Sequence, residues 1–425
     1  MTKHFTQLYK RHLFVWSSAL FVALSLIAAT LNYAYYPVIA HILSPSNFGA
    51  AQVLIALLLQ VGSIFSGLNL VVIFLVQKLS PEKSRQAIET LQKLTISFFA
   101  ALIVIVILGQ NVLLRFLHLD KRLYLFIVAL DLLTVIPFIL AYGNLQAHKR
   151  FFAAGSLQIT MVGTKLVLGF AATSRWGVVG ALLGFSLGQV FGVALYWLVS
   201  KLLRIAVWDH SILYALTPPR RQELAQLRPL AGSIGSIFVV NVLLVLFISF
   251  DIISARHYFG TLTSGLYAGA STLSNAIIFV CVPLIGVLLP HLHTGQLRLS
   301  RKVLFRTSGM VLSCGLFGTA VFALFPRPLL SIFGSQYTSF AYLLWRLGVL
   351  MALLSLITLL LQVSAFYRSK QTALICLAAL GGLIALVMSH HQSPRAMVSA
   401  LTWGFAIIVV ISLVQIWQVY GYKQD

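Results

Sequence analysis

The stretch from Tyr33 to Asn69 decides the fold, and at its centre lies the nine-residue segment His41-Ile-Leu-Ser-Pro-Ser-Asn-Phe-Gly49. One apolar segment ends just before it, and a second begins at Ala50. Each is long enough to cross a bilayer, because about 20 apolar residues cover the ~30 Å hydrocarbon core. Pro45 cannot continue a helix, and the nine residues include no acidic side chain, lysine or arginine. We therefore predict a membrane hairpin whose nine-residue turn faces the outside.

Composition places the whole chain in the same class. Of its 425 residues, 60% are hydrophobic and 9% are charged, which no soluble core with a polar coat would show. The sequence therefore predicts an all-α polytopic membrane protein. The net charge of +22 is that of many nucleic-acid-binding proteins. Here, however, the basic residues form short clusters between apolar segments, which is typical of cytoplasmic loops, so we expect no nucleic-acid partner.

Hydropathy predicts about 12 transmembrane helices. The first apolar segment follows basic residues, as in a signal peptide, but it is too long for one and we expect it to be retained. The predicted spans cover residues 14–40, 50–76, 93–117, 122–147, 153–173, 178–200, 229–254, 265–290, 304–325, 336–363, 371–389 and 395–420.

We expect three parts: an N-terminal six-helix bundle over 1–200, a cytoplasmic amphipathic linker over 201–228, and a C-terminal six-helix bundle over 229–425. The linker sets basic residues around apolar ones and is broken at Pro218-Pro219. About 21 lysines and arginines fall on the N-terminal side of the membrane, against about 7 on the other side. Both termini are therefore predicted to be cytoplasmic.

The hairpin turn has a counterpart in the second half of the chain. The segment Ser264-Gly-Leu-Tyr-Ala-Gly-Ala270 again leads into a membrane helix through a glycine. Placing Gly49 over Gly265 sets a period of about 216 residues, close to half the chain. This period suggests two similar halves, as in many transporters.

These segments carry a resemblance to a known family. Leu43-Ser-Pro-Ser-Asn-Phe-Gly49, together with Phe250-Asp-Ile-Ile253 and Gly265-Leu-Tyr-Ala-Gly269, resembles the oligosaccharide flippase, or polysaccharide transporter, family. That family belongs to the multidrug, oligosaccharidyl-lipid and polysaccharide exporter superfamily. The resemblance implies about 12 helices in two pseudo-symmetric six-helix bundles around a central cavity.

The function that the resemblance implies is transport by alternating access. A polyprenyl-diphosphate-linked oligosaccharide would move from the cytoplasmic to the outer leaflet of a bacterial inner membrane, for the synthesis of O-antigen, capsule or exopolysaccharide. The implied partners are the lipid-linked glycan, the phospholipid bilayer, and a glycan polymerase or other assembly proteins. A multidrug exporter of the same superfamily is the alternative, followed by a membrane-embedded glycan polymerase or transferase.

The residues that could carry chemistry are few. The chain has eight acidic residues, no Asp-x-Asp sugar-nucleotide motif and no phosphate-binding glycine-rich loop, so we expect neither enzyme activity nor a cofactor. The only close histidine pairs, at His291/His293 and His390/His391, have no acidic or cysteine ligand nearby, so we expect no metal site. The short outward loops also disfavour a polymerase or transferase.

Glycines recur at every fourth residue of the sixth span, at Gly180, Gly184, Gly188 and Gly192. Such a row forms a smooth groove that lets a neighbouring helix approach closely, so we interpret it as a packing surface. A contact that slides during alternating access is the alternative interpretation.

Polar and ionisable side chains inside spans are costly, and so they indicate function or a specific partner. Asp131 and Lys165 lie about 17 residues to either side of the turn at 148–150, so on antiparallel helices they would share a depth and could form an ion pair. We predict that Lys165, Arg346, Arg256, Asn32, Tyr36 and Gln60 bind substrate, and that Asp131 and Asp251 serve coupling or ion pairing. The competing interpretation is that these residues only hold helices together.

Overall fold

The computed structural model describes residue 24 and residues 27–60, 81–147, 151–202, 231–288 and 297–421. These residues are helical and include no β-strand. Within them, seven helices are long and apolar enough to cross a membrane, or eight if one bent pair counts as a single span. A helix, or the described part of one, stands at the place of each predicted span. The predicted class, an all-α polytopic membrane protein, is confirmed.

The helices form two compact units, each described by itself. Unit 1 contains the helix over residues 27–42, α3 (Pro81–Leu108), α5 (Leu123–Ala147), α6 (Phe151–Trp176) and α7 (Val178–Leu202). Unit 2 contains the helix over residues 45–60, most of α4 (Gln110–Phe116), α10 (Ala231–Tyr258), α11 (Thr261–Ser274), α12 (Ala276–Leu288), α13 (Leu297–Leu324), α14 (Pro326–Ser331), η2 (Ser335–Phe340), α15 (Ala341–Ser389) and α16 (Pro394–Gly421).

This division differs from the predicted bundles over 1–200 and 229–425 in two segments. The helix over 45–60 and the residues 112–120 come from the first half of the chain but belong to unit 2, because their packing partners lie on α10 and α11. The predicted linker over 201–228 lies outside the described residues, apart from the end of α7.

The predicted nine-residue turn is shorter in the structure. Helical residues continue to Ile42 and resume at Pro45, so only Leu43 and Ser44 interrupt them. Ser44 caps the second helix: its hydroxyl accepts a hydrogen bond from the Asn47 N–H at 3.4 Å, and its carbonyl oxygen accepts one from the Phe48 N–H at 2.8 Å. Proline suits the first position of a helix, because its fixed φ is already helical and its missing N–H would be unpaired there. The chain therefore restarts its helix at Pro45.

The two glycines that the sequence pattern equates lie in contact within unit 2. A Cβ built on Gly49 would lie 2.7 Å from the Gly265 Cα, and one built on Gly265 would overlap the carbonyl group of Pro45. Beside this contact, the Phe48 ring packs edge to face on Tyr337, with 5.6 Å between centroids. The helix over 45–60 is thus attached to the beginning of α11 by a contact that excludes any side chain.

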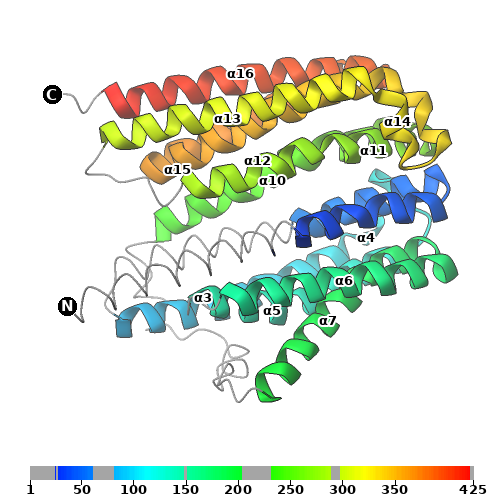
Figure 1. Ribbon diagram of the computed structural model, residues 1–425, viewed down its shortest axis with the longest axis horizontal. Helices are drawn as coiled ribbons and strands as arrows, with labels where there is room; N and C mark the ends of the chain where they lie inside the picture. The colour runs from blue at the N-terminus through cyan, green and yellow to red at the C-terminus, as the bar shows by residue number, and fades with distance from the viewer. Residues whose placement is uncertain are drawn as a thin grey trace, which may run out of the picture. The chain divides into compact units, whose positions relative to one another are not determined.

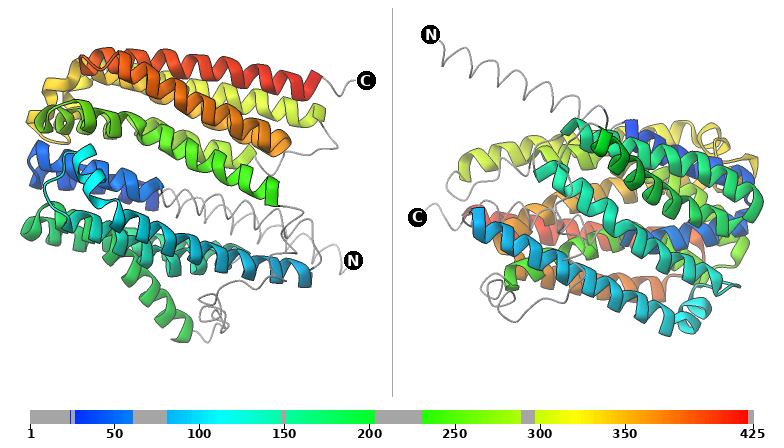
Figure 2. Two further views of the ribbon diagram at one scale, coloured as in Figure 1. Left: turned by 180° about the vertical axis from the view of Figure 1, so that it is seen from behind. Right: turned by 90° about the horizontal axis from the view of Figure 1, so that it is seen from below.

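Two predicted spans have irregular helices. The third is formed by α3 and α4, which meet at Gly109 with a bend of 66°. The tenth and eleventh are formed by α15, whose backbone is non-helical at Arg368. The helices α13, α15 and α16 run side by side (Figures 1 and 2), and the loops after α13 and α15 lie at one end of unit 2.

The glycines of the sixth span pack α7 against α6, as the packing interpretation predicts. A Cβ on Gly180 would overlap the carbonyl group of Ala172, and one on Gly188 would lie 2.8 Å from the Lys165 Cβ. At Gly180 and Gly188 the two helices therefore approach so closely that α7 has no room for a side chain.

We expect Gly188→Leu to destabilise the protein by about 1–3 kcal/mol, because the new side chain would be forced against α6. Gly163→Leu is the matched control, since a Cβ there meets no atom within 4 Å. Thermal unfolding of both purified variants in the same detergent measures the difference. Equal melting temperatures would contradict the assignment of this row as a packing surface.

Candidate functional site

Unit 1 contains a buried lysine surrounded by aromatic rings. Lys165 on α6 is only 3% exposed, and its ammonium donates a hydrogen bond to the Asn32 Oδ1. Its Nζ lies 4.6 Å from the centroid of the Tyr35 ring, 5.9 Å from that of Tyr36 and 4.3 Å from that of Phe185. All three distances are in the range of cation–π interactions. We call Asn32, Tyr35, Tyr36 and Phe185 the lysine cage.

The cage depends on local packing that the glycines permit. A Cβ on Gly169 would lie 2.6 Å from the Tyr35 ring, and one on Gly184 would lie 2.7 Å from the Tyr35 hydroxyl oxygen. The Tyr35 hydroxyl donates a hydrogen bond to the Ala181 carbonyl at 2.6 Å. Tyr35 is therefore fixed in a space that larger residues on α6 and α7 would close.

The charge of Lys165 is not matched by any carboxylate among the described residues. Its hydrogen-bond partner is a neutral amide, and the other close groups are ring faces. An ammonium has three donor hydrogens, and Asn32 accepts one of them. Two of the donor hydrogens therefore remain for other acceptors.

The predicted ion pair between Asp131 and Lys165 is wrong. Asp131, which is buried on α5, accepts a hydrogen bond from the Ser186 hydroxyl through Oδ1, and its Oδ2 has no hydrogen-bond partner within the described part of the chain. Lys165 contacts Phe185 and Asp131 contacts Ser186, which are adjacent residues of α7. The two charged residues therefore lie at the same depth along the helices, as predicted. Adjacent helical residues point about 100° apart, and this rotation separates the two charges.

Arg256, on α10 in unit 2, donates hydrogen bonds to two backbone carbonyls and a serine hydroxyl. Its guanidinium donates to the carbonyl oxygens of Leu117 at 3.0 Å and His118 at 2.9 Å, and to the Ser264 hydroxyl at 3.3 Å. It is 3% exposed. The two carbonyls follow the end of α4, where a cation is favoured by the helix dipole, so Arg256 ties that end to α10 and α11.

Asp251 is the buried acid of unit 2. Its Oδ2 accepts hydrogen bonds from the Tyr267 hydroxyl at 3.0 Å and from the Ser271 hydroxyl at 2.5 Å. Its Oδ1 has no hydrogen-bond partner among the residues that the structure describes. The arrangement is similar to that of Asp131, because hydroxyl groups hold one carboxylate oxygen in each case.

The two remaining predicted binding residues also lie in unit 2. The Gln60 side chain donates to the Val245 carbonyl at 2.9 Å, which joins the helix over 45–60 to α10. Arg346 donates to the Ser399 hydroxyl at 3.2 Å, and its guanidinium carbon lies 4.7 Å from the centroid of the Trp345 ring. The Gln60 and Arg346 hydrogen bonds each join two helices.

Of the six predicted binding residues, the structure thus brings together Lys165, Asn32 and Tyr36. Sequence reasoning missed Phe185, because a phenylalanine in a membrane span is ordinary. Its position directly after Gly184 is the one signal that could have indicated it, since the glycine groove faces α6 and so brings its neighbour close to Lys165.

No protein-family model matches the chain, and no curated protein matches it in sequence. Solved structures, however, resemble it over nearly its whole length. An inward-facing multidrug resistance MATE family transporter of the MOP superfamily has a TM-score of 0.66 and 14% identity, with 93% of this chain and 96% of that chain covered. The lipid II flippase MurJ, in an inward closed conformation, has a TM-score of 0.69 and 13% identity, with 94% and 87% covered.

A mutant of the Vibrio cholerae MATE transporter VcmN is also similar, with a TM-score of 0.59, 14% identity, and 96% and 98% of the two chains covered. At such identities the likeness concerns the fold alone. The chain therefore has the polytopic helical fold of these transporters.

Proposed function

We propose that this protein is a flippase that moves a polyprenyl-diphosphate-linked oligosaccharide from the cytoplasmic to the outer leaflet by alternating access. The observation that carries the proposal is the caged Lys165, a buried cation whose hydrogen-bond partner is neutral. The fold, shared with multidrug transporters and with a lipid II flippase, supports transport of either class of cargo. The site must therefore decide between them.

A buried ammonium favours an anionic cargo. A lysine at the middle of a membrane span costs roughly 3 kcal/mol or more unless it finds a partner or water. The diphosphate of the cargo would supply acceptors for the donor hydrogens that Asn32 leaves, and charge-assisted hydrogen bonds are about twice as strong as neutral ones. We propose that the diphosphate replaces the cage rings as the partner of Lys165 when the cargo is bound.

The groups of the cage also suit sugars. Asn32 offers both a donor and an acceptor, and the rings of Tyr35 and Tyr36 present apolar faces with polar hydroxyls. We propose that they contact the first sugars beside the diphosphate.

A multidrug exporter is the second candidate, and one observation favours it. The Asp131 Oδ2 in unit 1 has no hydrogen-bond partner within the described residues, and a cationic drug would seek such a carboxylate. Lys165 argues against this candidate. It contacts Phe185 on α7, and Asp131 contacts the next residue, Ser186, so the nearby ammonium would repel a cationic drug.

The proposal includes a setting and partners. The protein would lie in a bacterial inner membrane with both termini cytoplasmic, and would deliver its cargo to a glycan polymerase or other assembly proteins for O-antigen, capsule or exopolysaccharide synthesis. The loop charge asymmetry supports this orientation.

Replacement of Lys165 tests the proposal. We expect Lys165→Met to reduce flipping of a polyprenyl-diphosphate-linked glycan in proteoliposomes by at least tenfold, because methionine keeps the volume but removes the charge. Lys165→Arg should retain part of the activity. Lys201→Met is the matched control: this lysine also lies near an aromatic ring, with its Nζ 5.2 Å from the centroid of Trp197, but at the end of α7 and outside the cage.

Full flipping by Lys165→Met at normal protein level would refute the proposed role. If Lys165→Met instead lost flipping only together with its folding, Lys165→Arg decides: a folded but inactive arginine variant would contradict phosphate binding by the positive charge at this position.

A charge exchange tests the corrected pairing. We expect the double variant Asp131→Lys with Lys165→Asp to remain inactive, because the two side chains point to different faces of α7. Asp131→Asn should fold normally, since the amide oxygen can still accept the Ser186 hydrogen bond. Membrane expression, thermal unfolding and flipping are the measurements. Recovery of flipping in the double variant would indicate that the two side chains form an ion pair. It would contradict the separate contacts that the structure shows.

A further inference from the structure

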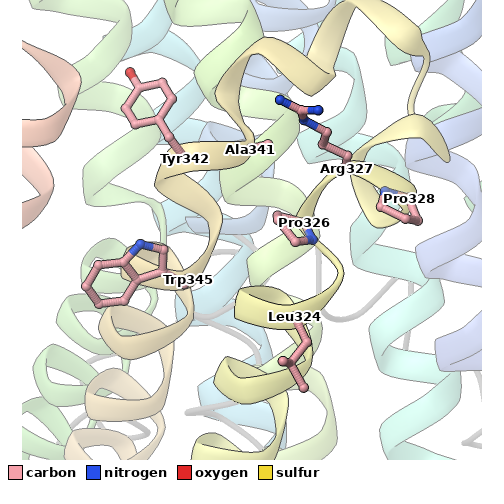
Figure 3. A pocket seen from close by; sticks show the side chains of 7 residues that line it. All are labelled: Leu324, Pro326, Arg327, Pro328, Ala341, Tyr342 and Trp345. Carbon is pink, nitrogen blue, oxygen red and sulfur yellow. The ribbon is translucent and has the colours of Figure 1, made fainter.

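Unit 2 has a pocket at the end where α13 finishes and α15 begins, with a volume of about 560 Å³. Figure 3 shows its lining: Arg327 from α14 lies on one side, and Tyr342 and Trp345 from α15 lie on the other. Pro326 and Leu324 complete the wall between them. None of these residues belongs to the lysine cage, which lies in unit 1.

The surface around the pocket is apolar and open. Leu324 is 72% exposed, and Phe325 and Ile332 are also exposed. In a membrane protein such side chains face lipid. Tryptophan and tyrosine are enriched where the hydrocarbon meets the headgroups, so Trp345 and Tyr342 indicate that the pocket opens at this level. A ligand of the pocket would therefore come from the bilayer.

The charge of this segment is positive, and the second half of the sequence has almost no acidic residue to balance it. After Asp251, no aspartate or glutamate occurs before the final residue, Asp425. Arg327 lines the pocket, and the Arg346 guanidinium stacks over the pocket's Trp345 at 4.7 Å while it donates to the Ser399 hydroxyl. An anion for Arg327 must therefore come from outside this half of the chain.

We propose that this pocket binds the headgroup of an anionic phospholipid, with the phosphate on Arg327. A guanidinium presents paired donors that match two phosphate oxygens, which favours a phosphate over a single-atom anion. The aromatic rings of Tyr342 and Trp345 would flank the glycerol backbone, and the acyl chains would lie along the exposed apolar residues Leu324 and Phe325. The site is independent of the transported cargo and does not rest on the proposed function.

The test measures lipid binding to the purified full-length protein in detergent. Phosphatidylglycerol is the probe, phosphatidylcholine tests the need for net negative charge, and inorganic phosphate tests the need for a lipid. We expect phosphatidylglycerol to raise the melting temperature and to remain bound in native mass spectrometry. Arg327→Gln should weaken this binding about tenfold, the effect of losing roughly 1.4 kcal/mol of charge-assisted hydrogen bonding.

Arg395→Gln is the matched control, because Arg395 is an exposed arginine at the start of α16 that does not line the pocket. It should bind phosphatidylglycerol as the unchanged protein does. Trp345→Phe should bind with intermediate strength.

The proposal fails if Arg327→Gln and Arg395→Gln bind the lipid equally. Arg327 would then contribute no more to lipid binding than an arginine outside the pocket. It also fails if phosphatidylcholine binds as tightly as phosphatidylglycerol, or if inorganic phosphate alone produces the same stabilisation.

Discussion

The close approach of α6 and α7 is the constraint on which the rest of unit 1 depends. Glycines on both helices remove the side chains that would hold them apart, and the space that remains accepts the Tyr35 ring. Tyr35 in turn packs edge to face on Phe185, with 5.7 Å between centroids, and both rings lie against the Lys165 ammonium. The glycine row is therefore both a packing surface and the reason why a lysine can be enclosed by aromatic rings at this depth.

The two units treat buried charge in a similar way. In each, a buried acid is held by hydroxyl groups: Asp131 by Ser186, and Asp251 by Tyr267 and Ser271. The buried cation Lys165 is held by a neutral amide and ring faces. Asp131 accepts its hydrogen bond from a hydroxyl group and does not pair with Lys165. The positive charge of the lysine can therefore still attract an anion. This arrangement favours the binding of an anion over that of a cation at Lys165.

Unit 2 shows how a segment from the first half of the chain is joined to the second. The glycine contact between Gly49 and Gly265 brings backbones together, and Arg256 fixes the end of α4 through the carbonyls of Leu117 and His118. Arg256, which we predicted from its charge to bind substrate, connects helices in this structure.

The sequence by itself determined the membrane class, the places of the helices and the packing role of the glycine row, because hydropathy and spacing along one chain report burial and helical faces directly. It also placed Asp131 and Lys165 at one depth, since depth follows from the rise per residue. Only the tertiary structure decided that these two do not pair, that Phe185 closes the cage, and that the helix over 45–60 belongs with α10 and α11. Such contacts depend on the rotation of each helix about its axis and on which helices become neighbours, and neither is fixed by the local pattern of residues.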